Sequence, residues 1–572
     1  MQKDNHLDKL DLEERVSYIH SNTPADKETG GNYDEVKTPG ELEDGALVDG
    51  GALNMYSREA FALFAQYGAI GIIYGMIPSL MYPIFNNYLN MEGYQTASYG
   101  VLVTTGWSFK VFFGMLSDCV PIFGYRRKSW MIIGWTITMI CLAIMSFVSL
   151  GDPYCDARQI DCSEITLEAA TPDQRKWFNE DAPSKGSLFI ILSMLVSVGY
   201  VVADCAADAM VVEYAQREPI AIRGRIQTAI YTVRTLTGIL AQVVVAFFLN
   251  GKEYGGTFDW AVGPNVPYAI CLVPCVLVVL STIFIQVEPK TRKMAFGEWI
   301  SQFWELLQKR VMWQICAYRF IANSFQAISA TPASPIAMKW AKVEPLNDSL
   351  SGVVGSLIFS GILIVVGKYG LNWNWRYTIA AGTLGVIAVD SFVTFMTIWD
   401  GLRNQWFYTG VALADNVPGG VRFIISTYCA VEIADVGNEG ATYGLVTTIN
   451  NLASPFASVI YKYIDSYFDV SQKAIMRDDD HVRWEVSYCF FISYSCKIFS
   501  LFWLFMLPPQ KAQMQELKKR GGKSKLAGAL LIVLFFCAIG FSLTSNIMAI
   551  FPSTKCYRIA GGKGTVNGTC PK

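Results

Sequence analysis

The chain has 572 residues, of which 52% are hydrophobic, 13% are aromatic and only 16% are charged. A soluble domain usually has about a quarter of its residues charged, so this composition excludes an ordinary soluble protein and indicates lipid as the solvent. The net charge of −2 gives no reason to expect a nucleic-acid partner.

The first 57 residues are polar and charged, beginning MQKDNHLDKLDLEERV. They lack the short apolar core of a cleavable signal peptide. We therefore expect a disordered cytoplasmic tail over 1–57.

Apolar runs long enough to cross a bilayer follow from residue 61 onwards. A bilayer core takes roughly 20 apolar residues per helix, and these runs are too long and too uniformly apolar for barrel strands. The sequence predicts thirteen membrane-spanning helices, over 61–85, 94–116, 129–150, 187–212, 226–250, 268–287, 313–339, 350–367, 377–396, 406–430, 441–466, 486–508 and 526–551.

An odd number of spans suggests two six-helix bundles and one additional helix. The fold class we predict is an all-α polytopic membrane protein with two six-helix bundles and one extra C-terminal transmembrane helix. The expected segments after the tail are an N-terminal six-helix bundle at 58–287, a cytoplasmic linker at 288–312, a C-terminal six-helix bundle at 313–508, a basic linker at 509–525, the extra transmembrane helix at 526–551 and an extracytoplasmic tail at 552–572.

The orientation follows from the loops. With the N-terminal tail inside, the inside loops are richer in Lys and Arg than the outside loops, as the positive-inside rule requires. Two Asn-x-Ser/Thr sequons, at Asn347 and Asn567, then fall outside, where glycosylation takes place.

Four cysteines also fall on the outside in this orientation. They form two pairs that are disulfide candidates on an oxidising face, Cys155 with Cys162 and Cys556 with Cys570. The other ten cysteines lie mostly within apolar runs, where they are most simply small core residues.

Lys110 lies inside an apolar run, eight residues before Asp118 and on nearly the same helix face. Two interpretations are open for this lysine. It either reaches the membrane surface or a structural partner, or it faces a water-filled cavity. We interpret Asp118, together with Arg126 and Arg127, as a cytoplasmic latch between neighbouring helices.

Two carboxylates, Asp204 and Asp208, are four residues apart and so lie on one helix face. Because they would repel each other, they suit a proton-coupling acid or a cation contact. Arg234 in the next helix could neutralise one of them. The alternative is a closed Asp–Arg pair that only holds helices together.

The second half has polar residues of its own. Arg319, Asn323 and Gln326 make one polar stripe on a helix that Pro332 and Pro335 then break, which favours substrate contact. Two more polar residues are candidates. Asn450 lies mid-helix, where it either faces the cavity or bonds another helix. Glu439 lies in the turn before the next helix, and it would serve this half as Asp118 serves the first.

Several kinds of chemistry have no support in the sequence. No P-loop pattern, no HExxH helix and no Cys/His zinc spacing occurs, and the three histidines lie outside the predicted helices. We therefore expect no enzyme, no metal and no cofactor.

Three segments together resemble the folate–biopterin transporter family of the major facilitator superfamily. They are WSFKVFFGMLSDCVPIFGYRRKSW, ADCAADAMVVEYAQREP with RGRIQTAIYTVRT, and VEIADVGNEGATYGLVTTINNLASP. Val111 stands where the family's WS-x-K-P pattern has proline. The resemblance covers about 60–508 and implies a major-facilitator-like fold of two six-helix halves around a central cavity.

By that resemblance, the central binding or coupling residues would be Lys110, Asp204, Asp208 and Arg234, and the cytoplasmic gates would be Asp118, Arg126, Arg127 and Glu439. The implied function is secondary-active transport of a pterin, folate or related metabolite by alternating access, with a coupling proton as a possible second solute. The sequons point to the plasma membrane. The alternative is a non-transporting receptor or scaffold on the same fold, which would be expected to have lost the charges within the membrane.

Overall fold

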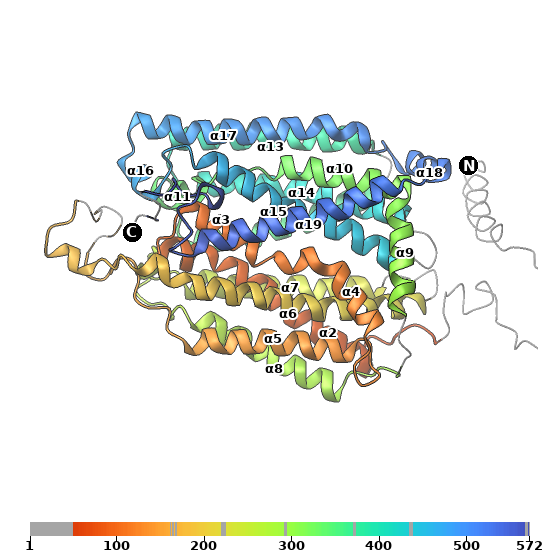
Figure 1. Cartoon of the computed structure of the whole chain (residues 1–572). Coiled ribbons are helices and arrows are strands. Elements are labelled where there is room, and N and C mark those ends of the chain that lie inside the picture. The colour runs from red at the N-terminus through yellow and green to blue at the C-terminus, as the bar shows by residue number, and fades with distance from the viewer. Residues whose placement is uncertain are drawn as a thin grey trace, which may run out of the picture.

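Long helices that run side by side make up the protein in the computed structural model (Figure 1). The structure describes residues 50–570, apart from gaps at 161, 163–164, 166, 168, 219–224, 291–294, 370–372, 434–438 and 567–569. The expected cytoplasmic tail therefore lies outside the described residues as far as residue 49. Within the described ranges the only strand-like contacts are isolated bridges.

The first half of the chain forms the helices α2 to α8, with two short helical turns. Their bounds are α2 Arg58–Ser79, η2 Met81–Tyr88, α3 Gly93–Leu102, η3 Thr105–Phe109, α4 Lys110–Cys119, α5 Lys128–Phe147, α6 Ala182–Gln216, α7 Arg225–Phe248 and α8 Val266–Phe284. The connecting helix α9, Phe296–Gln308, runs across the end of the bundle (Figure 1).

The second half and the C-terminal region follow. Their bounds are α10 Arg310–Gln326, α11 Ala333–Lys339, α12 Pro345–Tyr369, α13 Trp375–Ile398, α14 Gln405–Ile433, α15 Glu439–Asp465, α16 Gln472–Arg477, α17 Asp480–Ser500, η6 Leu501–Met506, α18 Lys511–Arg520 and α19 Lys525–Ile550.

Nine helices in the described part of the chain are long and apolar enough to cross a membrane. The four predicted spans not among them are 94–116, 313–339, 406–430 and 441–466. The first two are broken, into α3, η3 and α4 and into α10 and α11, whereas α14 and α15 are long enough but less apolar than the nine. The count of thirteen stays a prediction, and three of these four segments carry candidate site residues.

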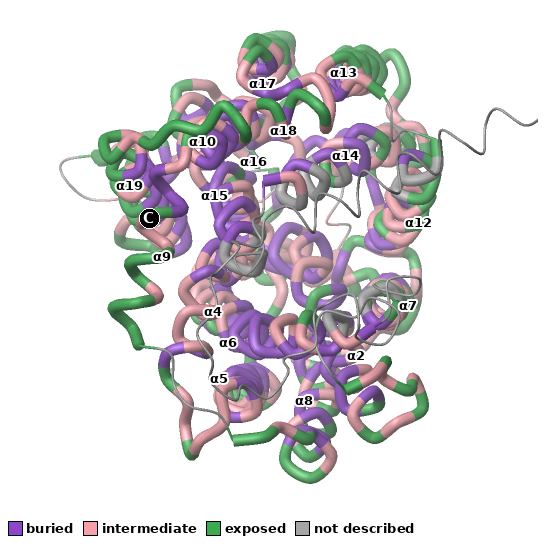
Figure 2. Tube along the Cα trace, turned by 90° about the vertical axis from the view of Figure 1, so that its right-hand side faces the viewer, coloured by how far each residue is buried: buried purple, intermediate pink, exposed green. Residues whose placement is uncertain are grey.

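Apolar packing divides the molecule into two main cores. The helices α2, α3 and α5 to α8 surround one core, in which Trp135 is fully buried, and α9, α10, α12 to α15, α18 and α19 surround another, in which Trp375 is 1% exposed. A smaller core lies among α11, α13, α16 and α17. Viewed along the helices, buried residues gather inside the bundle and exposed residues lie on its outer faces (Figure 2). An exposed apolar exterior is what a lipid solvent favours.

The last helix, α19, crosses the side of the bundle obliquely (Figure 1). It packs against α3 of the first half and against α15 and α10 of the second. Both disulfides lie at the end of the bundle where α19 finishes, which we call the outer end; the opposite end, where α9 lies, is the inner end.

Candidate functional site

Lys110 joins both carboxylates of α6 in one ion cluster. Its Nζ lies 3.0 Å from Oδ2 of Asp204 and 2.5 Å from Oδ2 of Asp208. The two acids are one helical turn apart, so a single ammonium can lie between them. The sequence left open whether Lys110 reaches the membrane surface, a structural partner or a cavity. In the structure it is the counter-ion of the acid pair.

The local backbone explains how a lysine on α4 reaches α6. The helix before it is tightened into the 3-10 turn η3, and the backbone N–H of Gly106 in that turn donates to Ser197 Oγ of α6 at 3.2 Å. A Cβ at Gly106 would lie 2.6 Å from the carbonyl oxygen of Ser197. Only glycine permits this approach, which sets the spacing for Lys110.

The three charged groups differ in their access to solvent. Asp204 is 1% exposed, whereas Lys110 is 17% and Asp208 is 24% exposed. Tyr67 of α2 donates a hydrogen bond to Asp208. The cluster therefore has a dry side at Asp204 and a wetter side, where a solute can approach, at Asp208.

Arg234 makes no ion pair with Asp204 or Asp208, so the closed Asp–Arg pair that the sequence left open is not formed. Its guanidinium lies 4.9 Å from the ring centre of Tyr74 and 5.1 Å from that of Trp107. Lys110 occupies the contact with both acids, and the faces of aromatic rings attract cations. The ring centre of Trp107 is also 5.1 Å from Lys110 Nζ, so one indole ring contacts both cations.

The tyrosine beside Arg234 shows that this region borders open space. Tyr74 is 44% exposed although it contacts Arg234 and lies edge-on to Trp107. A Cβ at Gly71 would collide with the carbonyl oxygen of Arg234, so α2 and α7 approach closely here. Tyr67, Tyr74 and Trp107 were missed from the sequence because aromatic residues are common in every span.

A second polar cluster lies in the other half. Oδ1 of Asn450 on α15 accepts from Nδ2 of Asn323 at 2.6 Å and from a guanidinium nitrogen of Arg319 at 3.2 Å, both on α10. Gln326 does not join them, because its amide oxygen accepts from Ser500, the last residue of α17. The expected polar stripe is therefore split, and Gln326 has a structural partner.

The two clusters lie on either side of a direct contact between the halves. The backbone N–H of Val111, next to Lys110, donates to Thr448 Oγ1 at 3.3 Å, two residues before Asn450. Ser108 donates to the carbonyl oxygen of Asn451 at 3.4 Å. Residues next to the candidates in sequence thus join the two halves directly.

The expected latch residues meet at the inner end of the first half. Arg127 lies 2.7 Å from Asp118 and 3.5 Å from Glu213, which is also 3.8 Å from Arg126. Glu288 after α8 accepts from the backbone N–H groups of Arg126 and Arg127 at 2.9 and 3.0 Å. Glu213 and Glu288 were not predicted; both stand beside arginines in space but far from them in sequence.

Glu439, the expected counterpart of this latch, begins α15, but its side chain lies outside the described residues.

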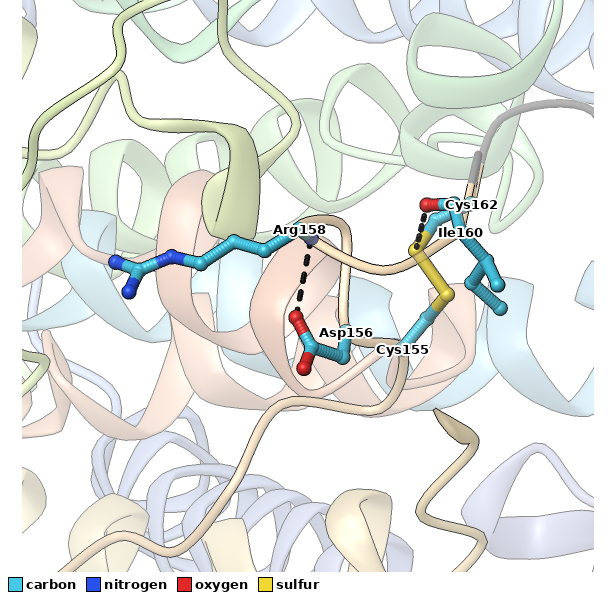
Figure 3. The surroundings of a disulfide bond; sticks show 5 residues. All are labelled: Cys155, Asp156, Arg158, Ile160 and Cys162. Carbon is cyan, nitrogen blue, oxygen red and sulfur yellow. Dashed lines mark hydrogen bonds between the residues drawn. A yellow bond between two sulfur atoms is a disulfide. The ribbon is translucent and has the colours of Figure 1, made fainter. Parts of the chain in front are cut away.

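At the outer end the structure holds both cysteine pairs as disulfides, Cys155–Cys162 and Cys556–Cys570. Figure 3 shows the first, where the backbone N–H of Arg158 donates to Asp156 inside the loop. This disulfide lines a pocket of about 530 Å³ between loops of the two halves.

The structure describes only one of the two predicted glycosylation sites. Asn347 is 2% exposed within α12, so a glycan on its amide nitrogen would not fit the folded structure, and the expected modification there is corrected. Asn567 lies outside the described residues.

Comparison with known proteins supports the same family. The BT1 family matches residues 71–156, which include Lys110 and the latch. A curated relative, the folate-biopterin transporter of Synechocystis sp., is 20% identical over 404 residues, which cover 66% of this chain and 70% of the relative.

Solved structures show the fold. A D-xylose-proton symporter has a TM-score of 0.53 at 13% identity, covering 79% of this chain and 98% of its own. The inward open xylose transporter XylE from E. coli has a TM-score of 0.51 at 13% identity, covering 81% and 100%.

The protein is a multi-pass membrane transporter with the all-helical major facilitator fold, and not an enzyme. The two sequence comparisons confirm the resemblance read from its motifs: the chain is related to the folate–biopterin transporters, and its substrates are small molecules.

Proposed function

We propose that the protein carries a folate, pterin or related heterocycle across the plasma membrane by alternating access, and that the Lys110 cluster is the centre of its binding site. The observation that carries this proposal is Lys110 held between Asp204 and Asp208, beside the direct contact of the two halves. Charges at membrane depth are costly and are typical of substrate or ion pathways.

The surrounding groups suit a flat, polar ring with an acidic tail. Trp107 and Tyr74 offer ring faces for stacking. Asp208 can accept from the amino edge of a pterin, and Arg234 or Arg319 can bind a carboxylate with paired hydrogen bonds. The Synechocystis relative, a folate-biopterin transporter, supports this class of solute.

A coupling proton fits the same cluster. One oxygen of Asp204 is buried and has no hydrogen-bond partner among the described residues, and buried polar atoms are normally paired. Protonation of either acid would weaken its hold on Lys110, because the ion pair would lose its negative partner. The ammonium would then be released toward the solute.

The latch around Arg127 would act as the inner gate of the first half. Its bonds join Arg127, at the start of α5, to Ser117 and Asp118 at the end of α4 and to Glu213 of α6. We propose that these bonds break and reform as the halves rock, together with Glu439 in the second half. Rocking of one half against the other about a midplane site is the usual scheme for such repeats.

Uptake into proteoliposomes tests the proposal. Labelled folate and labelled biopterin are offered with and without an inward proton gradient. We expect saturable uptake, stimulated by the gradient, that Arg234→Ala and Asp208→Asn reduce to background while the variants stay folded.

The matched control is Lys176→Ala, which removes an exposed lysine of the outer loop and should leave uptake unchanged. Wild-type uptake by both site variants would overturn the site. Binding of the solutes without any uptake would favour a receptor over a carrier.

A further inference from the structure

Lys462, near the outer end of α15, is a second lysine inside the bundle, and it is fully buried. Its Nζ donates to Ser98 Oγ at 2.8 Å and to Asn546 Oδ1 at 2.7 Å. Ser98 belongs to α3 of the first half and Asn546 to α19. One ammonium therefore ties together the first half, the second half and the additional helix.

The partners of Lys462 are neutral. No acid lies within ion-pair distance of its Nζ in the described ranges. The nearest in sequence, Asp465, accepts from the backbone N–H of Thr331 at 2.7 Å. A buried cation without a carboxylate is expensive to keep, so a merely packing role would be served better by an apolar side chain.

Asn546 is built to receive this ammonium. Its Nδ2 donates to the carbonyl oxygen of Ser542 at 2.8 Å, which fixes the amide and turns Oδ1 toward α15. Ser458 of α15 also donates to that oxygen, at 3.2 Å. On the same face of the bundle, Gln95 of α3 donates to the carbonyl oxygen of Ala549 at 3.2 Å.

The outer end is closed in this structure by other bonds between the halves. Tyr82 donates to the carbonyl oxygen of Val343 at 2.6 Å. The backbone N–H of Gln472 donates to Glu92 at 2.8 Å, and its amide donates to the carbonyl oxygen of Met91 at 3.1 Å. When the outer end opens, α3 must move away from α15, and the bond from Lys462 to Ser98 must break.

We propose that Lys462 is a gating residue that holds the outer end closed, and that α19 serves transport by supplying Asn546, which keeps the ammonium bonded when Ser98 leaves. The role of gate rests on the proposed alternating access. The additional helix α19 is thus part of the gate, because its Asn546 bonds Lys462, the residue that joins the two halves.

The test measures the outer opening directly, without substrate. Spin labels are placed at Lys185 on α6 and Asp480 on α17, which are exposed helix positions at the outer end of the two halves. Exposed Cys537 is replaced by serine, and distances are measured by double electron–electron resonance in lipid nanodiscs.

We expect wild type to show one dominant short distance. In Lys462→Met the ratio of long to short distances should rise about tenfold, as the loss of a hydrogen bond to a charged group predicts. Ser98→Ala removes only the acceptor on the first half and should shift the ratio in the same direction. If the methionine variant does not fold, Ser98→Ala alone tests the proposal.

The control is Ser545→Ala, which removes a hydrogen bond from α19 to its own C-terminal tail. It should leave the distances unchanged. Distances like those of wild type in both Lys462→Met and Ser98→Ala would overturn the proposal. Because no solute is present, this result is independent of whether folates are the substrate.

Discussion

Two lysines lie inside this bundle, and the protein satisfies them in opposite ways. Lys110 lies between two carboxylates and is 17% exposed, whereas Lys462 has only neutral oxygen partners and is fully buried. The first has charged partners and enough exposure to exchange one of them for a solute. The second is out of reach of solutes and can only act on the protein itself.

This difference separates a binding role from a gating role. Removing the cation of a buried ion pair leaves charges uncompensated, which is strongly destabilising. Removing a cation from neutral partners leaves dipoles that can find other bonds. The variants below use this contrast, from the largest expected effect to the smallest.

Lys110→Ala should have the largest effect on transport. It leaves Asp204 and Asp208 one turn apart without their shared cation, and the repulsion disfavours the site geometry. We expect initial uptake rates to fall at least about 100-fold, corresponding to about 3 kcal/mol.

The measurement is initial uptake normalised to the amount of folded protein in the membrane. A rate within twofold of wild type would show that the solute does not need this cation.

Substitution of each lysine by methionine should separate the two roles in stability. Lys110→Met should lower the melting temperature by several degrees, because two carboxylates lose their partner. Lys462→Met should leave it unchanged or raise it, because Ser98 still donates to the carbonyl oxygen of Tyr94 and Asn546 still accepts from Ser458.

Thermal unfolding of both variants in the same detergent makes this comparison. Equal losses of stability would mean that Lys462 is an ordinary structural bond and would remove the contrast.

Arg319 is a third cation, and it sharpens the comparison because it too is held by a neutral oxygen. Asn450→Ala removes the acceptor shared by Arg319 and Asn323. We expect uptake to fall about tenfold, as a lost hydrogen bond to a charged group predicts.

The neighbouring Asn451→Ala is the control, since the amide of Asn451 makes only a long 3.5 Å contact to the carbonyl oxygen of Trp107. If both variants transport equally well, the second-half cluster has no part in binding.

Tyr67→Phe should have the smallest effect. It removes one hydroxyl that donates to Asp208 and keeps the ring. We expect a change of a few-fold in the KM for the solute, because Asp208 then binds Lys110 more strongly. Concentration-dependent uptake measures this change, and a KM equal to that of wild type would place Tyr67 outside the site.

The sequence was sufficient to predict the fold class and to single out most of the charged residues of the candidate site. Asp204 and Asp208 stood out because a spacing of four places both on one helix face. Lys110 stood out because lipid rejects a lysine in an apolar run. These are local properties, and they can be recognised without knowledge of the tertiary structure.

The pairing of these residues was not available from the sequence. Lys110 pairs with α6 because Gly106 brings the two backbones close, a contact across about ninety residues of chain. Arg234 was a candidate partner for one acid because opposite charges attract, but its contacts are with the rings of Tyr74 and Trp107.

Lys462 was overlooked for a related reason. It lies four residues before the end of a predicted span, where a lysine normally extends to the membrane surface. The packing of α3 and α19 against α15 buries it.

Equilibrium binding tests the central claim most directly. Labelled folate and biopterin are titrated onto purified wild type, Lys110→Ala and Arg234→Ala, each first shown by thermal unfolding to be folded. The account predicts saturable binding of at least one solute to wild type and a loss of at least about tenfold in affinity in both variants. Wild-type affinity in two folded variants would contradict it.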